Sequence, residues 1–325
     1  MRAIVRDGQS VQFSTSHPAP MPQDGHAIVR VRKAGVSATD VQVAHGLFDF
    51  NGVLGHEFVG VVESVSSPAN GLVGRRVVGA IADRCGRCEM CLAGLRDHCR
   101  QRTLLGLRGR DGCFADRLAV RVENLVPVPD DVDDDRAVFA HVVASALQAR
   151  RQLTIEGKPF ITILGDGPLG LVTAQIMVRL NASVRVIGRY SQKLAICEKW
   201  GVKHRHADDI GRRADQDIVV ECTGSPDGFA LAARLVRPRG TIVLKTLHAD
   251  WDRRQIGADL TPLVMNEINV IGSAHGPLGE ALGVLQRHEV DVVSLIGRRM
   301  SLGDGVAILK AAAQPGALKV LVDVA

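Results

Sequence analysis

The sequence predicts an α/β protein in which a β-rich N-terminal part precedes a doubly wound parallel sheet. Short apolar runs with period-two alternation, separated by glycine and proline, fill the chain to about residue 130. From residue 160 onward, apolar strands alternate with helical patterns, which is typical of a parallel sheet covered on both faces. A glycine-rich turn directly follows the first of these later strands.

The expected elements follow the chain in order. The N-terminal strands are HAIVRVRK (26–33), EFVGVVESV (57–65) and GRRVVGAI (74–81). The acidic run Asp133 to Asp135 precedes an expected helix over 135–149, and its charges favour the helix N-terminus. The later strands and helices are expected in the order FITILG, a helix from Pro168, SVRVIG, a helix from Ser191, DIVVECTG, a helix from Pro226, GTIVLKT and INVIGSA. Two further helices and a strand at KVLVDV are expected in the last part of the chain.

Length and composition limit the class of protein. The chain has 325 residues, enough for two domains, and its 46% hydrophobic and 23% charged residues are ordinary for a folded globular protein. A formal charge of +5 without a dense basic block, and only 3% aromatic residues, argue against a nucleic-acid partner. Without an 18-residue apolar run or a signal-type N-terminus, we expect a cytoplasmic protein with no membrane partner.

Four of the seven cysteines lie close together. Their spacing is C-x2-C-x2-C-x7-C in a polar stretch, at Cys85, Cys88, Cys91 and Cys99. In a chain without a secretion signal, this spacing indicates metal ligation rather than disulfides. Four thiolates complete the tetrahedral coordination of zinc, so we predict a structural zinc site. An iron–sulfur cluster and four free thiols are the alternatives.

The glycine-rich turn is GDGPLG, in which Gly165, Gly167 and Gly170 form GxGxxG between an apolar strand and a helix. The first glycine permits the tight turn, the second lets the backbone approach a pyrophosphate, and the third permits close helix packing. The helix begins with Pro168 and Leu169, and its free N–H groups favour phosphate binding. The sequence therefore predicts a dinucleotide site.

The end of the next strand bears on the choice between NADP and NAD. An NAD site normally has an acidic residue there, but this strand ends in Gly188, Arg189 and Tyr190. With no carboxylate to repel a 2′-phosphate, and with Arg189 and Lys193 as candidate ligands for one, the pattern favours NADP. An ordinary surface arginine, with NAD as the cofactor, is the alternative. Thr223, at the end of DIVVECTG, is expected to face the same cofactor crevice.

The β-rich N-terminal part, the cysteine spacing and the later GxGxxG together resemble the medium-chain dehydrogenase/reductase superfamily, the zinc-dependent alcohol dehydrogenases with their threonine, sorbitol and polyol relatives. The most specific marks are GHEFVGVV (55–62), the cysteine lobe and GDGPLG. The resemblance implies a GroES-like catalytic domain over 1–142 with a zinc lobe at 85–99, a Rossmann domain over 143–276, and a segment, 277–325, that returns to the catalytic domain. It also implies a small-molecule substrate and a homodimer or homotetramer, in which INVIGSA extends the sheet.

The same resemblance implies a catalytic zinc, usually held by a cysteine, the histidine of GHE and a later glutamate or cysteine. His56 matches that histidine and is followed by Glu57, but Ser37 stands at the cysteine position and His141 at the third position. Serine and two histidines bring no negative charge to zinc, so affinity should fall unless Glu57 joins them. His56, His141 and Glu57 can form the His₂Glu set known from zinc hydrolases; a site without metal is the alternative.

Four residues are the catalytic candidates that the resemblance implies: Ser37, Thr39, Asp40 and Glu57. Thr39 keeps the hydroxyl that contacts the substrate oxygen, and Asp40 keeps the carboxylate that orients the histidine. The predicted reaction is hydride transfer between NADP(H), or NAD(H), and a small alcohol, polyol or carbonyl compound. A zinc-independent quinone or enone reductase, with hydrogen-bond donors in place of metal, is one alternative. A catalytically impaired NADP(H)-binding sensor is the alternative from another class.

Overall fold

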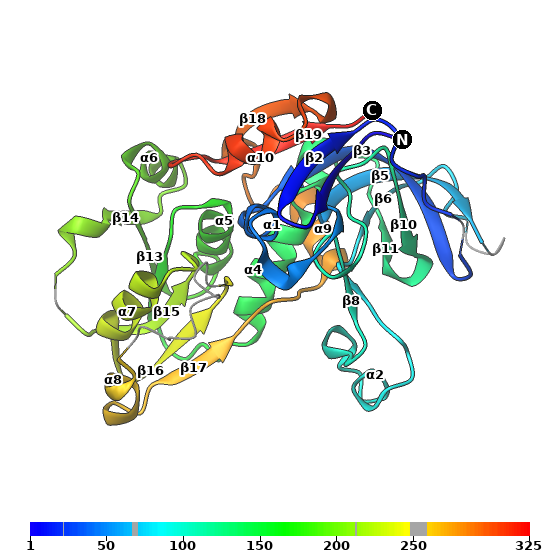
Figure 1. Ribbon diagram of the computed structural model, residues 1–325. Helices are drawn as coiled ribbons and strands as arrows, with labels where there is room; N and C mark the ends of the chain where they lie inside the picture. The colour runs from blue at the N-terminus through cyan, green and yellow to red at the C-terminus, as the bar shows by residue number, and fades with distance from the viewer. Residues whose placement is uncertain (22, 67–70, 212, 248–258) are drawn as a thin grey trace. The chain divides into compact units, whose positions relative to one another are not determined.

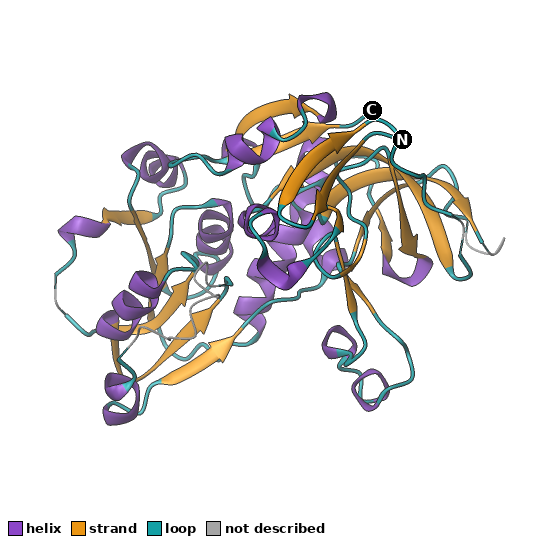
Figure 2. Ribbon diagram, in the orientation of Figure 1, coloured by secondary structure: helices purple, strands orange, loops and turns teal. Residues whose placement is uncertain are grey.

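The computed structural model of the protein describes residues 1–325 except 22, 67–70, 212 and 248–258. The described residues form two compact units. Unit 1 comprises Met1–His141, Leu278–Glu289 and Leu295–Ala325, and unit 2 comprises Val142–Pro277 and Val290–Ser294. Unit 1 is rich in strands and unit 2 contains a parallel sheet with helices, so the predicted α/β class is confirmed (Figure 1, Figure 2).

Strands dominate unit 1. In the described part of the chain they are β1 (Ala3–Asp7), β2 (Ser10–Ser14), β3 (His26–Val36), β4 (Gly52–Val53), β5 (Glu57–Val65), β6 (Arg76–Gly79), β7 (Ala82–Asp83), β8 (Thr103–Leu105), β9 (Gly109–Arg110), β10 (Arg117–Arg121), β11 (Leu125–Pro127), β18 (Ile296–Ser301) and β19 (Lys319–Asp323). The large sheet has the order β11-β6-β5-β3-β19-β18, with β10 also paired to β3, and β2-β1-β4 and β7-β8-β9 form smaller sheets. The antiparallel pairing of β19 with β3 places the C-terminal strand in the large sheet.

The core of unit 1 follows from the alternation in its long strands. In β3, Ala27, Val29 and Val31 are fully buried, and in β5 Phe58 and Val62 join the same apolar cluster. Short helices connect and cover the strands: α1 (Ala38–Ala44), η1 (Leu47–Asp49), α2 (Glu89–Leu92), η2 (Arg96–His98), η3 (Val122–Asn124), α3 (Asp134–Ala137), α9 (Leu278–Gln286), η6 (Leu302–Asp304) and α10 (Ala307–Ala312). Figure 1 shows the segment with α2 standing apart from the large sheet.

The single helix expected over 135–149 is interrupted. The structure has α3 (Asp134–Ala137) and then α4 (Ala140–Arg151). Asp133 caps α3, because its carboxylate accepts a hydrogen bond from the Arg136 N–H at 2.8 Å. The helix tightens at Phe139, whose N–H bonds to the Arg136 carbonyl three residues back at 3.0 Å, so the regular pattern ends there.

Unit 2 has the strand order of a doubly wound nucleotide-binding fold. In the described residues its strands are β12 (Phe160–Leu164), β13 (Ser183–Gly188), β14 (Lys203–His206), β15 (Gln216–Glu221), β16 (Val236–Leu244) and β17 (Asn269–Gly272). Its helices are α5 (Pro168–Met177), α6 (Ser191–Lys199), η4 (Ala207–Asp209), α7 (Pro226–Leu235) and α8 (Thr261–Met265). Most of α4 and of η5 (Val293–Leu295) also belongs to this unit. The parallel sheet runs β14-β13-β12-β15-β16-β17, and α5 and α7 lie on opposite sides of it (Figure 2). The order reverses between β12 and β15, whose carboxyl ends are where such folds bind ligands. None of the helices in the described residues has the length and apolar character needed to span a bilayer.

Candidate active site

Three side chains of unit 1 with metal-binding atoms lie together. His56 immediately precedes β5, Glu57 begins it, and His141 lies in the first turn of α4. Their ligand atoms are all within 4.8 Å of one another, and the two imidazole rings meet edge to face with centroids 5.3 Å apart. We call these three residues the metal group. Its donors match the His₂Glu type of zinc site.

Asp40 fixes the orientation of His56. The Asp40 Oδ1 atom lies 2.7 Å from His56 Nδ1, and both side chains are buried. Burial alone would lower the pKa of His56, but the charge and hydrogen bond of Asp40 raise the pKa above its usual value. Burial alone would raise the pKa of Asp40, but the charge and hydrogen bond of His56 lower it, and the net effect is a pKa below the usual value. The contact through Nδ1 leaves His56 Nε2 as the atom for a metal ion.

Ser37 has a structural task that cysteine would not perform as well. It is the N-cap of α1: Ser37 Oγ accepts from the Asp40 N–H at 3.1 Å, while Asp40 Oδ2 accepts from the Ser37 N–H at 2.8 Å. The Asp40 carboxylate thus joins the helix cap to His56. Thr39 lies half-buried in the first turn of α1. His45, which follows α1, is exposed, and its Nδ1 contacts the Val41 carbonyl at 2.7 Å.

Lys319 contacts the metal group and was not among the residues predicted from the sequence. Its ammonium pairs with Glu57 Oε2, and both side chains are only 3% exposed. A Cβ on Gly35 would lie 2.8 Å from Glu57 Oε2 and 2.9 Å from Lys319 Cε, so the glycine leaves room for the pair. The available signal was a lysine at the start of the apolar strand KVLVDV, since a lysine in such a strand needs a buried partner.

The four lobe cysteines also converge. Sγ–Sγ distances are 3.6 Å for Cys88–Cys91, 3.8 Å for Cys88–Cys99 and 3.6 Å for Cys85–Cys99. Zinc–sulfur bonds of about 2.3 Å place tetrahedral ligands about 3.8 Å apart, so the residues present fit zinc. Backbone N–H groups of Cys91 and Arg100 lower the pKa of the Cys88 thiol to about 6, which favours the thiolate that a metal needs.

The glycine turn of unit 2 has the geometry that a pyrophosphate requires. Gly165 has φ +113°, which favours glycine, and a Cβ on Gly170 would lie 2.1 Å from the Gly165 carbonyl oxygen. Gly167 caps α5, with Pro168 as the first helical residue, and the space where its Cβ would be is open. The turn therefore fits a dinucleotide, with free N–H groups at the start of α5 that include that of Leu169.

The expectation of no carboxylate at the end of the second strand is wrong. Asp166 Oδ2 accepts hydrogen bonds from the Arg189 and Tyr190 N–H groups at 2.7 and 2.8 Å. Lys193, expected to be available to a phosphate, is buried with its Nζ 3.8 Å from Asp166 Oδ1 and 4.7 Å from the Tyr190 ring centroid. Burial lowers the pKa of Lys193, and Asp166 partly opposes this. Of the two expected phosphate ligands, only Arg189 is exposed.

Thr223 lies at the switch point of the sheet, just after β15 and exposed. Its N–H donates to the buried Glu221 carboxylate at 2.6 Å, and its hydroxyl lies 2.9 Å from Ser225 Oγ. These contacts shape the turn that follows β15.

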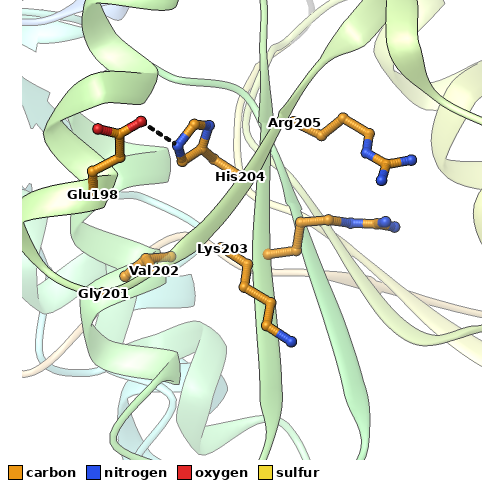
Figure 3. A pocket seen from close by; sticks show the side chains of 7 residues that line it. Glu198, Gly201, Val202, Lys203, His204 and Arg205 are labelled. Carbon is orange, nitrogen blue, oxygen red and sulfur yellow. Dashed lines mark hydrogen bonds and ion pairs between the residues drawn. The ribbon is translucent and has the colours of Figure 1, made fainter.

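A separate hollow of about 460 Å³ lies along β14, where His204 pairs with Glu198 at 3.3 Å (Figure 3). None of the predicted site residues lines that hollow.

Unit 2 has the strand order and the glycine turn of a dinucleotide-binding fold, which is typical of nucleotide-dependent dehydrogenases. The family model for the alcohol dehydrogenase GroES-like domain matches residues 23–130. The model for the glucose dehydrogenase C-terminus matches residues 138–310, which is more than half of the chain. The chain therefore belongs to the zinc-dependent alcohol dehydrogenase-like family of the medium-chain superfamily. It is an NAD(P)-dependent oxidoreductase of that type.

Individual relatives agree with this assignment. The chain is 25% identical to the sorbitol dehydrogenase of Halalkalibacterium halodurans over 99% of its length and 98% of the relative, and 29% identical to the L-threonine 3-dehydrogenase of Rhizobium rhizogenes over 70% and 71%. Among solved structures, a protein described as a zinc-binding dehydrogenase from Sinorhizobium meliloti, bound to NADP, superposes with a TM-score of 0.88 at 25% identity, covering 99% of both chains. Galactitol-1-phosphate dehydrogenase from Escherichia coli shares the fold, with a TM-score of 0.87 at 24% identity over 100% of both chains.

Proposed function

We propose that the protein transfers a hydride between NADP(H) and a small alcohol, polyol or carbonyl compound at a zinc site formed by the metal group. The observation that carries this proposal is the convergence of His56, Glu57 and His141 within 4.8 Å. A bound zinc ion would act as a Lewis acid on the substrate oxygen. When an alcohol is oxidised, its hydride would go to NADP⁺, and Thr39, whose side chain is half-buried, would pass the hydroxyl proton on to solvent water.

Each residue of the metal group has a defined task in this proposal. Asp40 holds Nδ1 of His56, so that Nε2 is the ligand atom. His141 supplies the second nitrogen, and Glu57 supplies the negative charge that Ser37 does not. Because Glu57 also pairs with Lys319, metal binding must compete with an internal ammonium. A second zinc in the cysteine lobe has a structural task, since its four thiolates leave no open position.

The proposed preference for NADP depends on Arg189. Its side chain is exposed at the end of β13, and its planar guanidinium suits a bidentate contact with the 2′-phosphate. The Sinorhizobium meliloti relative is bound to NADP, which supports the preference. Lys193 contributes indirectly, by neutralising Asp166.

Metal analysis with matched variants tests the zinc proposal. The wild type is expected to contain two zinc ions per chain after purification without chelator, and Glu57→Gln close to one. Glu63→Gln is the matched control: it lies on the same strand but pairs with Arg117 on the surface, so two ions are expected. Turnover of alcohols, polyols, aldehydes or ketones with NADP(H) should fall in Glu57→Gln only. One zinc per chain in both the wild type and Glu57→Gln would show that the metal group binds no zinc.

The buried Glu57–Lys319 pair favours one second candidate, a reductase of quinones or enones that needs no catalytic metal. In this candidate the pair is permanent, and hydroxyl groups polarise the carbonyl. Turnover of quinones or enones by protein with a single zinc per chain would support it. Absence of turnover on every class of substrate, with intact NADP(H) binding, would instead indicate a sensor.

We also infer a homodimer or homotetramer in which β17 extends the sheet of unit 2 into its partner. β17 is an edge strand, and Val270 in it is 43% exposed. Unpaired backbone groups and apolar side chains at an edge favour pairing with another strand. Light scattering on the wild type and on Val270→Asp tests this, with a smaller mass expected for the variant and an unchanged mass contradicting it.

A further inference from the structure

The end of β13 has no side chain of its own, yet a carboxylate fills the space beside it. A Cβ built on Gly188 would lie 2.5 Å from Asp166 Oδ2 and 2.6 Å from Asp166 Cβ. A nucleotide-binding unit with this topology normally has an acidic side chain of the second strand at this point. Here the carboxylate comes from the glycine turn after β12, 23 positions earlier than Arg189.

The charge of Asp166 is balanced inside the protein. Oδ2 accepts the N–H groups of Arg189 and Tyr190, and Oδ1 faces the Lys193 ammonium at 3.8 Å. The Asp166 and Lys193 side chains are only 9% and 6% exposed. A carboxylate neutralised in this way repels a phosphate much less than one that faces the ribose. Asp166 therefore acts on the backbone of the turn.

The peptide groups on both sides of Arg189 are fixed. Its N–H donates to Asp166 at 2.7 Å, and its carbonyl lies 2.8 Å from His206 Nε2. Because a carbonyl oxygen only accepts, His206 Nε2 is the donor in this contact. Arg189 is thus an exposed residue whose backbone is held by Asp166, from the turn after β12, and by His206, from β14.

We propose that Asp166 is a positioning residue for NADP recognition: it holds the Gly188–Tyr190 turn so that Arg189 meets the 2′-phosphate. A side chain that starts from a fixed backbone loses less entropy when it binds, and the gain applies only to a ligand that Arg189 contacts. NAD has no 2′-phosphate, so Asp166 should change the ratio of the two affinities. This inference rests on the NADP preference proposed above.

Fluorescence titration of NADPH and NADH tests the proposal without requiring turnover. Asp166→Ala should weaken NADPH binding roughly tenfold, the equivalent of one charge-assisted hydrogen bond, and change NADH binding less than about twofold. Asp166→Asn should keep most of the preference, because a single amide oxygen can accept both N–H groups as Oδ2 does. Thermal unfolding of each variant confirms that it is folded.

The outcomes separate this inference from the proposed function. Equal losses for both cofactors in Asp166→Ala would show a merely structural role, and tighter NADPH binding would show that Asp166 repels the phosphate; either result overturns the positioning role. A wild type that binds NADH as well as NADPH, with Arg189→Ala unchanged, would overturn the NADP preference and the inference with it. A wild type that prefers NADPH, with the preference intact in Asp166→Ala, would overturn the inference alone.

Discussion

Replacing Lys319 by methionine tests how the metal group is balanced in charge. The Lys319 ammonium and the Glu57 carboxylate are each 3% exposed. Removing one partner of such a pair costs about 3–5 kcal/mol, because the other charge stays buried without compensation. For a unit of this size, that loss lowers the unfolding midpoint of the metal-depleted protein by about 10 °C.

Zinc should reverse the loss in the variant. In Lys319→Met, a zinc ion bound by the nitrogens of His56 and His141 would compensate the negative charge of Glu57. In the wild type, zinc must first displace the ammonium from Glu57. A ligand at one hundred times its dissociation constant stabilises the native state by about 2.7 kcal/mol. Zinc should therefore raise the midpoint more in Lys319→Met than in the wild type.

Calorimetry of metal-depleted protein with increasing zinc measures both effects. Lys33→Met is the matched control, because Lys33 is also partly buried but pairs with Asp135 and Asp323, away from the metal group. It should lose stability without a larger zinc response, and zinc in the cysteine lobe contributes equally to all three proteins. Equal responses to zinc in all three proteins would refute the competition between Lys319 and metal. A Lys319→Met protein that is as stable as the wild type in the absence of zinc would refute the cost of about 3–5 kcal/mol assigned to breaking the Glu57–Lys319 pair.

Three further perturbations have defined outcomes. Cys99→Ser should remove one zinc per chain, by metal analysis, since Cys99 is one of four converging thiols. Burial raises the pKa of Asp135, but hydrogen bonds from its two basic partners lower it below the usual value; its stabilising effect is present at neutral pH and lost as the pH falls through that lowered pKa. Asp135→Asn should thus cost about 1 kcal/mol in urea unfolding at pH 7, and this cost should shrink as the pH falls below the usual carboxyl range; a cost that does not change with pH would contradict the argument. Gly188→Asp should destabilise by about 1–3 kcal/mol through its clash with Asp166, and addition of Asp166→Gly should restore stability and favour NADH in the fluorescence titration.

Local patterns predicted most of the fold. Apart from β14, the strands of unit 2 contain apolar runs bounded by turn residues, and GxGxxG places its turn between a strand and a helix through backbone requirements alone. The strand β14 was not predicted, because its sequence, KHRH, is polar throughout. The convergence of the lobe cysteines was predictable because all four lie within fifteen consecutive positions. The interruption between α3 and α4 was not, because the apolar spacing of residues 135–149 continues through it.

The sites were less predictable where the partners come from distant elements. Glu57 and Lys319 are 262 positions apart, and only the pairing of β19 with β3 and of β3 with β5 brings them together. Asp166 lies within a motif that is defined by its glycines, and the motif does not indicate that the Asp166 side chain contacts the end of the next strand. The residues at the end of β13 indicate what that strand contributes to the site. They do not indicate that Asp166, in the turn after the neighbouring strand β12, also lies there.

Two departures from the family pattern have a common physical solution. At position 37 the hydroxyl caps α1, and in the proposed metal site the negative charge would come from Glu57. At position 188 there is no side chain, and Asp166 fills the space and bonds to the backbone that follows. In each place the missing group's charge is supplied from another part of the chain and paired with a buried lysine, Lys319 or Lys193. A buried carboxylate needs compensating partners, and for Glu57 and Asp166 the lysine limits how far the carboxylate can act on a ligand. In the proposed sites, Glu57 would exchange Lys319 for a metal ion, whereas Asp166 stays paired with Lys193 and acts through the backbone that carries Arg189.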